Sequence, residues 1–261
     1  MKYHSAAAPL AMLMLLADLP LAAAAELTSQ TSMAFDDYLR QAREAFLARV
    51  RTDMGPTPKS EGMPARPGRE DGIVTVPSGL IHHWVGGAFI PRATLQRALA
   101  VSNAYDAYSR IYKEVIASKL VGRDGDTYQV LIRIKESEAG VGAVLDILST
   151  VQYFRPTPRL VYAITTSDQI REVKNAGLAN ERLLPAGRDS GYLWRAGSFT
   201  TLVEQDAGVY VGMETLGLSR GFPPLLGWFI EPIARRLGRK SIERSLEEFI
   251  AAVRKADAVS P

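Results

Sequence analysis

The sequence contains no cysteine and only three histidines. The protein therefore has no disulfide bonds and no thiolate ligands for a metal. Structural zinc sites normally combine four Cys and His ligands, and beyond residue 4 the sequence offers only the neighbours His82 and His83. Neighbouring residues on a strand point to opposite faces, so these two do not readily share one ion. We expect neither a metal nor another cofactor.

A strong excess of either charge is also lacking, because 31 Lys and Arg stand against 28 Asp and Glu, giving a net charge of +3. The charges are dispersed, and no basic stretch is interleaved with aromatic residues. We therefore expect no binding of nucleic acid. The pI near 9.1 leaves open a transient contact with an anionic membrane surface. The composition, 47% hydrophobic and 23% charged, is that of a globular protein.

Long hydrophobic runs are missing except at the start of the chain. Residues 1–25 combine the charged Lys2, an apolar core over residues 6–17, and small residues at Ala23 and Ala25, as in a secretory signal peptide. The alternative is a membrane anchor, but the apolar core falls well short of the roughly 20 residues that span a bilayer. We expect cleavage after Ala25 and a periplasmic or secreted protein.

Residues 26–71 are expected to form an amphipathic helix followed by a linker rich in proline and glycine. The helix, Met33–Arg51, carries on one face the residues Phe35, Leu39, Ala42, Phe46 and Val50. We expect this face to pack against the main domain, whose start we place near Gly72. Two alternatives remain open: the helix lies on a membrane surface, or it acts as a lid.

The rest of the chain, residues 72–261, has the pattern of an antiparallel α+β domain. Asp124-Gly125 and the Pro-Thr-Pro at 156–158 indicate two hairpins. The order is one strand, two short helices, six more strands and a long final helix. The expected strands are Leu80–Phe89, Lys113–Val121, Thr127–Lys135, Val144–Phe154, Leu160–Thr166 with a possible extension to Lys174, Tyr192–Val203 and Gly208–Leu218. The short helices begin at Pro91 and cover Tyr105–Tyr112, and the final helix covers Leu225–Arg254.

Four strings in this domain carry a resemblance to a known superfamily: IHHWVGGAFIP at 81–91, DAYSRIY at 106–112, GYLWR at 191–195 and GVYVGMETLGLSR at 208–220. Over residues 80–255 the chain resembles the START-like, or SRPBCC, superfamily, and within it an exported bacterial family. The resemblance implies a helix-grip fold, in which a curved seven-stranded antiparallel sheet wraps around a long C-terminal helix. It also implies a hydrophobic cavity between the two, and it brings no universal catalytic residue.

Candidate ligand-binding residues follow from that cavity and from their chemistry. Aromatic side chains with a polar handle suit the wall of a site for an amphipathic molecule, although each has core packing as its simpler explanation. An arginine paired with Glu214 could grip a carboxylate or hydroxyl head group, unless these positions mark the solvated outer face of the sheet. Which of His82 and His83 faces the cavity is open. The candidates are His82, Trp84, Tyr105, Tyr108, Tyr112, Arg133, Tyr153, Arg195, Glu214 and Trp228.

The string GLSRG at 217–221 matches the G-x-S-x-G nucleophile elbow of serine hydrolases. In that class the histidine follows the serine along the chain, whereas no histidine follows His83. Pro223 and Pro224 also interfere with a tight turn into a helix. We therefore interpret the match as chance and assign no catalytic residue.

The function that we expect is carriage or sequestration of a hydrophobic or amphipathic small molecule, a lipid or a polycyclic compound. One alternative is an enzyme of the cyclase or aromatase type, with His82 or His83 and a nearby Glu or Arg transferring protons in the cavity. Another is an interaction module of the cell envelope that uses the helix Met33–Arg51. The sequence assigns no oligomeric state.

Overall fold

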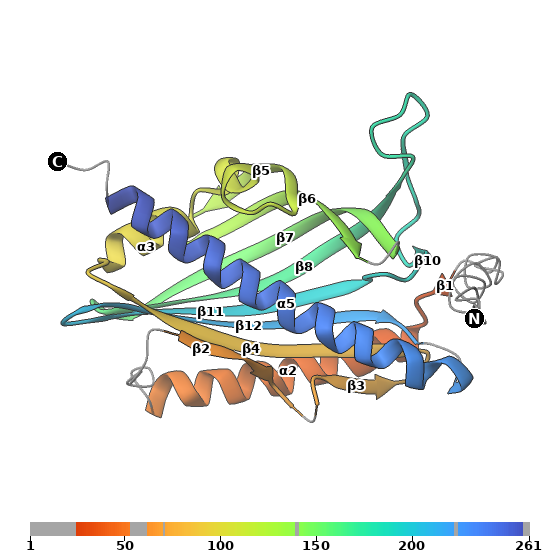
Figure 1. Cartoon of the computed structure of the whole chain (residues 1–261), viewed down its shortest axis with the longest axis horizontal. Helices are drawn as coiled ribbons and strands as arrows, with labels where there is room; N and C mark the ends of the chain where they lie inside the picture. Colours follow the sequence, from red (N-terminus) through yellow and green to blue (C-terminus); the bar gives the residue numbers. More distant parts are fainter. Residues whose placement is uncertain (1–24, 53–61, 70, 139–140, 222–223, 258–261) are drawn as a thin grey trace, which may run out of the picture.

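The computed structural model describes residues 25–52, 62–69, 71–138, 141–221 and 224–257. A large antiparallel sheet carries one long helix on each of its two faces (Figure 1). The helices are α2 (Ser29–Thr52) and α5 (Pro224–Asp257), with α3 (Leu95–Ser102), the 3-10 turn η1 (Tyr105–Ala107) and α4 (Tyr108–Ile111) after the first long strand. The predicted signal peptide, apart from Ala25, lies outside the described residues.

The main sheet has ten strands, of which eight follow the order β2-β4-β12-β11-β8-β7-β6-β5, while β3 pairs with β4 and β9 with β8. Every neighbouring pair is antiparallel. The bounds are β2 (Gly62–Pro67), β3 (Ile73–Val76), β4 (Gly79–Pro91), β5 (Val115–Asp124), β6 (Thr127–Glu138), β7 (Val141–Thr157), β8 (Leu160–Lys174), β9 (Arg182–Leu183), β11 (Arg195–Gln205) and β12 (Gly208–Arg220). A separate pair joins β1 (Ala25–Glu26) to β10 (Arg188–Asp189).

The predicted α+β class, the order of the elements and the long C-terminal helix are confirmed. Both predicted hairpins form, and Gly125 takes the positive φ of 55° that the tight turn between β5 and β6 requires. The strand count is corrected from seven to ten. Part of the difference lies in the segment expected to be a linker, where residues 62–67 form β2 at the edge of the sheet. Its prolines escape the usual penalty because an edge strand leaves one row of hydrogen-bonding groups unused.

The first face of the sheet, which we call the α2 face, is covered by α2. Phe35, Tyr38, Ala42 and Phe46 of α2 form one buried cluster with the strands, and Phe46 stacks on Phe199 of β11 with 4.9 Å between ring centroids. The other strand residues of this cluster are Ile81, Ile164, Trp194, Leu216 and Leu218. The expectation that the helix packs against the main domain is therefore confirmed. Its apolar stripe is occupied by the sheet.

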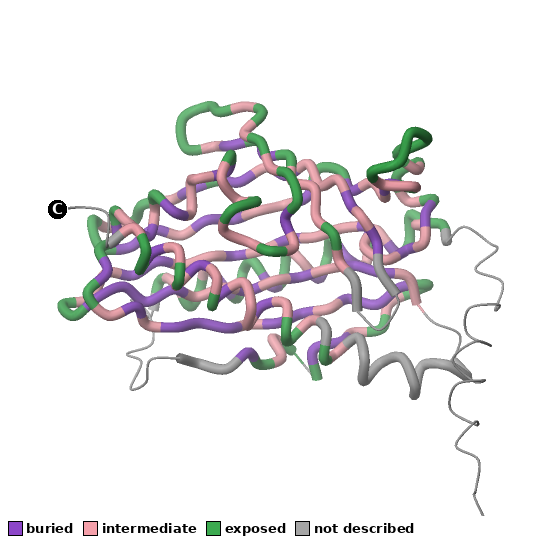
Figure 2. Tube along the Cα trace, turned by 45° about the horizontal axis from the view of Figure 1, so that its top comes forward, coloured by how far each residue is buried: buried purple, intermediate pink, exposed green. Residues whose placement is uncertain are grey.

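The second face, the α5 face, is covered by α3, η1 and α5. Ile242, Leu246 and Phe249 of α5 belong to the largest buried cluster. A side chain at Gly238 would meet the indole nitrogen of Trp84 at 2.3 Å, so glycine lets α5 approach β4 closely. Figure 2 shows buried positions interspersed with half-buried ones along the central strands, as expected where both faces of a strand are covered, whereas β5 at the edge also carries exposed positions. Among the described residues, no helix is long and apolar enough to cross a membrane.

Candidate functional site

The register of the sheet decides which side chains can line a site under α5. His82 pairs with Gly217 of β12 and lies on the α5 face, whereas its neighbour His83 pairs with Leu216 on the α2 face. The Nε2 atom of His82 lies 2.8 Å from the Oγ atom of Ser219. Burial lowers the pKa of His82 to about 4, so its imidazole is neutral at pH 7.

A wall of tyrosines closes one end of the α5 face. The rings of Tyr112, Tyr108, Tyr105, Tyr128 and Tyr153 follow one another at centroid distances of 5.1 to 5.5 Å. The hydroxyl of Tyr153 lies 2.9 Å from those of both Tyr105 and Ser102. The Tyr108 hydroxyl donates to the carbonyl oxygen of Ser102 at 2.5 Å.

Burial raises the pKa of Tyr105, Tyr108, Tyr112 and Tyr153, so their hydroxyls stay neutral even well above physiological pH. Those of Tyr105, Tyr108 and Tyr153 already have protein partners, which leaves little of their hydrogen-bonding capacity for a ligand. The predicted tyrosines therefore lie together on the expected face, as a packed, hydrogen-bonded wall.

An open groove lies next to this wall, between α3 and the turn that joins β7 to β8. Its volume is about 770 Å³. Three of its apolar residues, Leu95, Leu99 and Val161, belong to or pack against the same buried cluster as α5, so the floor of the groove is continuous with the α5-face core. The lining residues are Thr94, Leu95, Gln96, Leu99, Arg155, Pro156, Thr157, Pro158, Val161 and Glu204.

The groove has polar groups of both signs at its rim. Glu204 accepts a hydrogen bond from the backbone N–H of Leu95 at 3.1 Å and so caps the first turn of α3. Arg155 pairs with Asp126 at 2.6 Å on the exposed side. The arrangement offers an apolar floor and a charged rim, which suits a molecule with an apolar body and a polar end. Sequence reasoning missed this groove because its residues come from separate elements, namely α3, β7, β8, β11 and the turn between β7 and β8.

Glu214 is the first of three predicted site residues that the structure places on the α2 face instead. It is 4% exposed, and its carboxylate accepts a hydrogen bond from Nε2 of His83 at 2.8 Å and is paired with Arg49 of α2. Nδ1 of His83 lies 2.9 Å from the Tyr38 hydroxyl. Because a carboxylate only accepts, Nε2 carries the proton and Nδ1 can accept from Tyr38. This chain of contacts, Tyr38–His83–Glu214–Arg49, runs from buried side chains to the exposed Arg49 and joins α2 to the sheet.

The other two corrections are Arg195 and Arg133. Arg195 donates to Ser32 and Asp36 of α2, at 2.9 and 2.8 Å, and lies over the ring of Phe35. The predicted Arg195–Glu214 pair is thus replaced by separate contacts of each residue with α2. Arg195 and Glu214 share this face, but Glu214 lies opposite Phe199 in the register, four residues along β11 from Arg195, so roughly 13 Å separates the two positions.

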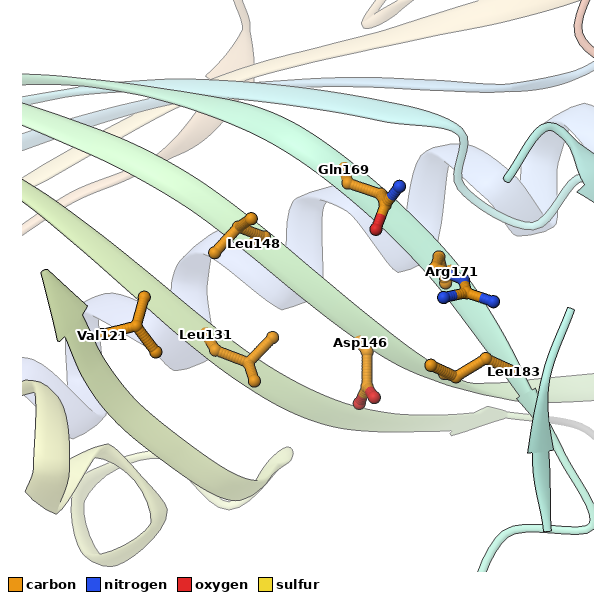
Figure 3. Close-up of a pocket in the computed structure, with 7 residues that line it drawn as sticks. All are labelled: Val121, Leu131, Asp146, Leu148, Gln169, Arg171 and Leu183. Carbon is orange, nitrogen blue, oxygen red and sulfur yellow. The ribbon is translucent and has the colours of Figure 1, made fainter. Parts of the chain in front are cut away.

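Arg133 lies at the end of the α2 face that α2 leaves free, beside a second hollow. It makes two hydrogen bonds to Asp146, at 2.6 and 2.8 Å, and one to Glu181 at 2.8 Å. Figure 3 shows the hollow, of about 220 Å³, on the side of the sheet away from α5. It is lined by Val121, Leu131, Asp146, Leu148, Gln169, Arg171 and Leu183. None of the candidate residues from the sequence lines this hollow, but Arg133 is paired with Asp146, which does.

The remaining candidates are Trp84 and Trp228. Trp84 is buried on the α5 face against Gly238. Trp228 lies outside the described side chains. Within the part of the chain that the structure describes, no three His, Asp or Glu side chains gather as a metal site would need.

Comparison with known proteins adds structural neighbours only. No family model and no curated protein matches the chain. A protein from Thermus thermophilus has a TM-score of 0.49 at 13% identity, covering 68% of this chain and 99% of that one. A STAR-related lipid transfer protein fragment from Xanthomonas axonopodis has a TM-score of 0.47 at 15% identity, covering 70% of this chain and 99% of that one. A START superfamily protein from Mycobacterium smegmatis has a TM-score of 0.43 at 12% identity, covering 67% of this chain and 99% of that one. At such identities these neighbours assign neither a ligand nor a reaction to this chain.

Proposed function

We propose that this protein binds a hydrophobic or amphipathic small molecule, a lipid or a polycyclic compound, on the α5 face of its sheet, and carries or sequesters it. The observation that carries the proposal is the groove between α3 and the β7–β8 turn. Its apolar floor, through Leu99 and Val161, is continuous with the core beneath α5. A molecule that enters past the charged rim meets this apolar floor.

The size and chemistry of the groove support this proposal. A volume of about 770 Å³ falls within the range of small-molecule sites, roughly 300 to 1,000 Å³. Burial of apolar ligand surface contributes about 25 cal/mol per Å². The rim residues Arg155 and Glu204 would orient a polar end group, while the floor takes the apolar body.

A binding titration of the full-length protein with N-phenyl-1-naphthylamine, whose fluorescence rises in apolar sites, tests the proposal. Leu99→Glu places a charge on the groove floor, and we expect at least a tenfold loss of affinity. Leu131→Glu is the matched control, because Leu131 lines the hollow on the other face, and we expect less than a twofold change. Circular dichroism checks that both variants fold. Equal affinity in both variants, or no binding by the unaltered protein, would contradict the proposal.

A second candidate, a cyclase-type enzyme, is favoured by the contact of His82 with Ser219. With a pKa of about 4, His82 is unprotonated at pH 7, as a general base must be, but such a low pKa makes it a weak base. His83 and Glu214 are removed from this role because they lie on the α2 face. His82→Ala separates the two functions: a carrier retains its ligand, whereas an enzyme loses turnover with binding retained.

We also propose that the protein acts outside the cytoplasm, as the signal-like residues 1–25 indicate. Intact-mass measurement of the protein recovered from its producing cells tests this. A mature chain that begins at Glu26 supports export, and a full-length chain that stays in the cytoplasm argues against it.

A further inference from the structure

The middle of the α5 face is lined by small and hydroxyl-bearing side chains. The register places Trp84, Thr215, Ser198, Thr165 and Val151 in one row across five strands. A parallel row begins with His82 and Gly217 and continues through Ala196 to the paired Ser167 and Ser149. Apart from His82, Trp84 and Val151, these two rows carry only small side chains.

The opposite face of the same strands has a different composition. Between these hydroxyl positions, the strands send Ile81, Ile164, Phe199, Leu216 and Leu218 to the α2 face, where all five are buried. The hydroxyl rows are therefore not the solvated side of a sheet with one dry face. They lie on the face that holds the largest apolar cluster, and each of their members is buried or half-buried.

Four hydroxyls of these rows, and that of Thr200 on the same face, make no hydrogen bond within the part of the chain that the structure describes. They come from four neighbouring strands, β7, β8, β11 and β12. Other polar groups of the same face are paired: Ser219 with His82, and Ser167 with the backbone N–H of Ala196 at 2.8 Å. None of the five oxygens is among the described buried side-chain atoms that lack a partner, so water reaches them. A ligand that displaces this water must replace its hydrogen bonds. The five residues are Ser149, Thr165, Ser198, Thr200 and Thr215.

We infer that the ligand is a fused-ring compound bearing several hydroxyl or keto oxygens, rather than an alkyl chain. This inference rests on the proposed function and names its ligand class. An alkyl chain lying over these hydroxyls would displace their water and offer them no hydrogen-bond partner in return. Neighbouring strands lie about 4.8 Å apart, and oxygens on alternate carbons of a six-membered ring are separated by a similar distance. A flat ring system can therefore meet hydroxyls from successive strands.

Three probes distinguish the ligand classes in titrations of the full-length protein followed by tryptophan fluorescence. They are 1,3,8-trihydroxy-6-methylanthraquinone, anthracene and palmitic acid. We expect the oxygenated ring compound to bind at least ten times more tightly than either of the others. Anthracene has a similar ring skeleton without the oxygens, so the difference between the two measures the contribution of the hydroxyl floor.

Matched variants assign this difference to the floor. Thr165→Val with Thr200→Val removes two α5-face hydroxyls at nearly constant volume. We expect affinity for the oxygenated probe to fall about 5- to 100-fold, with anthracene unchanged. Thr166→Val with Thr201→Val is the control, because these residues are the next ones on the same two strands and face α2. We expect it to change affinity less than twofold.

The two proposals fail in different ways. If anthracene or palmitic acid binds as tightly as the oxygenated compound, and the Thr165–Thr200 variant behaves like its control, the inferred ligand class is wrong while the proposed function stands. If none of the three probes binds, and N-phenyl-1-naphthylamine does not bind either, both are wrong.

Discussion

The two faces of the central strands differ although they belong to the same strands in alternation. Under α2, the buried Glu214 is paired with both His83 and Arg49, and the buried ring of Phe199 stacks on Phe46. On the α5 face, hydroxyls such as those of Ser198 and Thr215 have no partner in the described chain. The part of the α2 face under α2 therefore serves stability, whereas the α5 face keeps accessible hydroxyls that a bound ligand can meet.

The largest effect on stability should come from removing a buried ring on the α2 face. Phe35→Ala removes a ring that is 0% exposed, and we expect the free energy of unfolding to fall by about 3 to 5 kcal/mol, because a cavity is left between α2 and the sheet. Denaturant unfolding measures this. Met33→Ala, on the exposed side of the same helix at 61%, should change stability by less than about 0.5 kcal/mol. Equal losses in the two variants would contradict the packing of α2.

On the α5 face, His82 should make the stability of the protein fall at acid pH. Its pKa of about 4 in the folded protein lies below the 6.5 expected when unfolded, so the unfolded chain binds the proton more readily. Stability should therefore fall as the pH drops from 6.5 towards 4, by at most about 1.4 kcal/mol per pH unit and about 3 kcal/mol in total. His82→Gln should remove this part of the pH dependence. The difference between the two unfolding profiles measures it, because other groups titrate in both proteins.

A smaller effect on the α2 face should follow from Glu214→Gln. The amide keeps the shape but loses the charge that pairs with Arg49, and we expect a loss of about 1 to 3 kcal/mol in unfolding free energy. Ligand affinity should change less than twofold, because Glu214 lies on the far side of the sheet. A tenfold loss of affinity with unchanged stability would return Glu214 to the binding site and reverse the assignment of the faces.

The smallest effect should come from the tyrosine wall. Tyr153→Phe removes the hydroxyl that joins Ser102 and Tyr105, and we expect a loss of about 0.5 to 1.5 kcal/mol. Thermal unfolding measures this, and Tyr162→Phe is a control on the neighbouring strand and the opposite face. If Tyr153→Phe instead weakens ligand binding without a loss of stability, the wall contacts the ligand through its hydroxyls.

Much of the fold was accessible from sequence because it depends on local periodicity. Alternation over Gly208–Leu218 predicted β12, and Asp124-Gly125 predicted the hairpin of β5 and β6. The apolar stripe of Met33–Arg51 predicted a packed helix. The edge strand β2 was missed because a proline-rich segment carries the same signal for a linker and for an edge strand. The candidate site was only partly accessible: Trp84 and the four candidate tyrosines share the α5 face, whereas Arg133, Arg195 and Glu214 lie on the α2 face.

Local sequence patterns were enough to specify the strands, the helices and their order, because side chains alternate with a period of two in strands and repeat every 3.6 residues in helices. They were also enough to put His82 and His83 on opposite faces. Which face meets α5 and which meets α2 emerged only from tertiary packing, because alternation divides a strand into two sets without saying what covers either. The groove, the paired Glu214 and the rows of unpaired hydroxyls all arise from the register between strands distant in sequence.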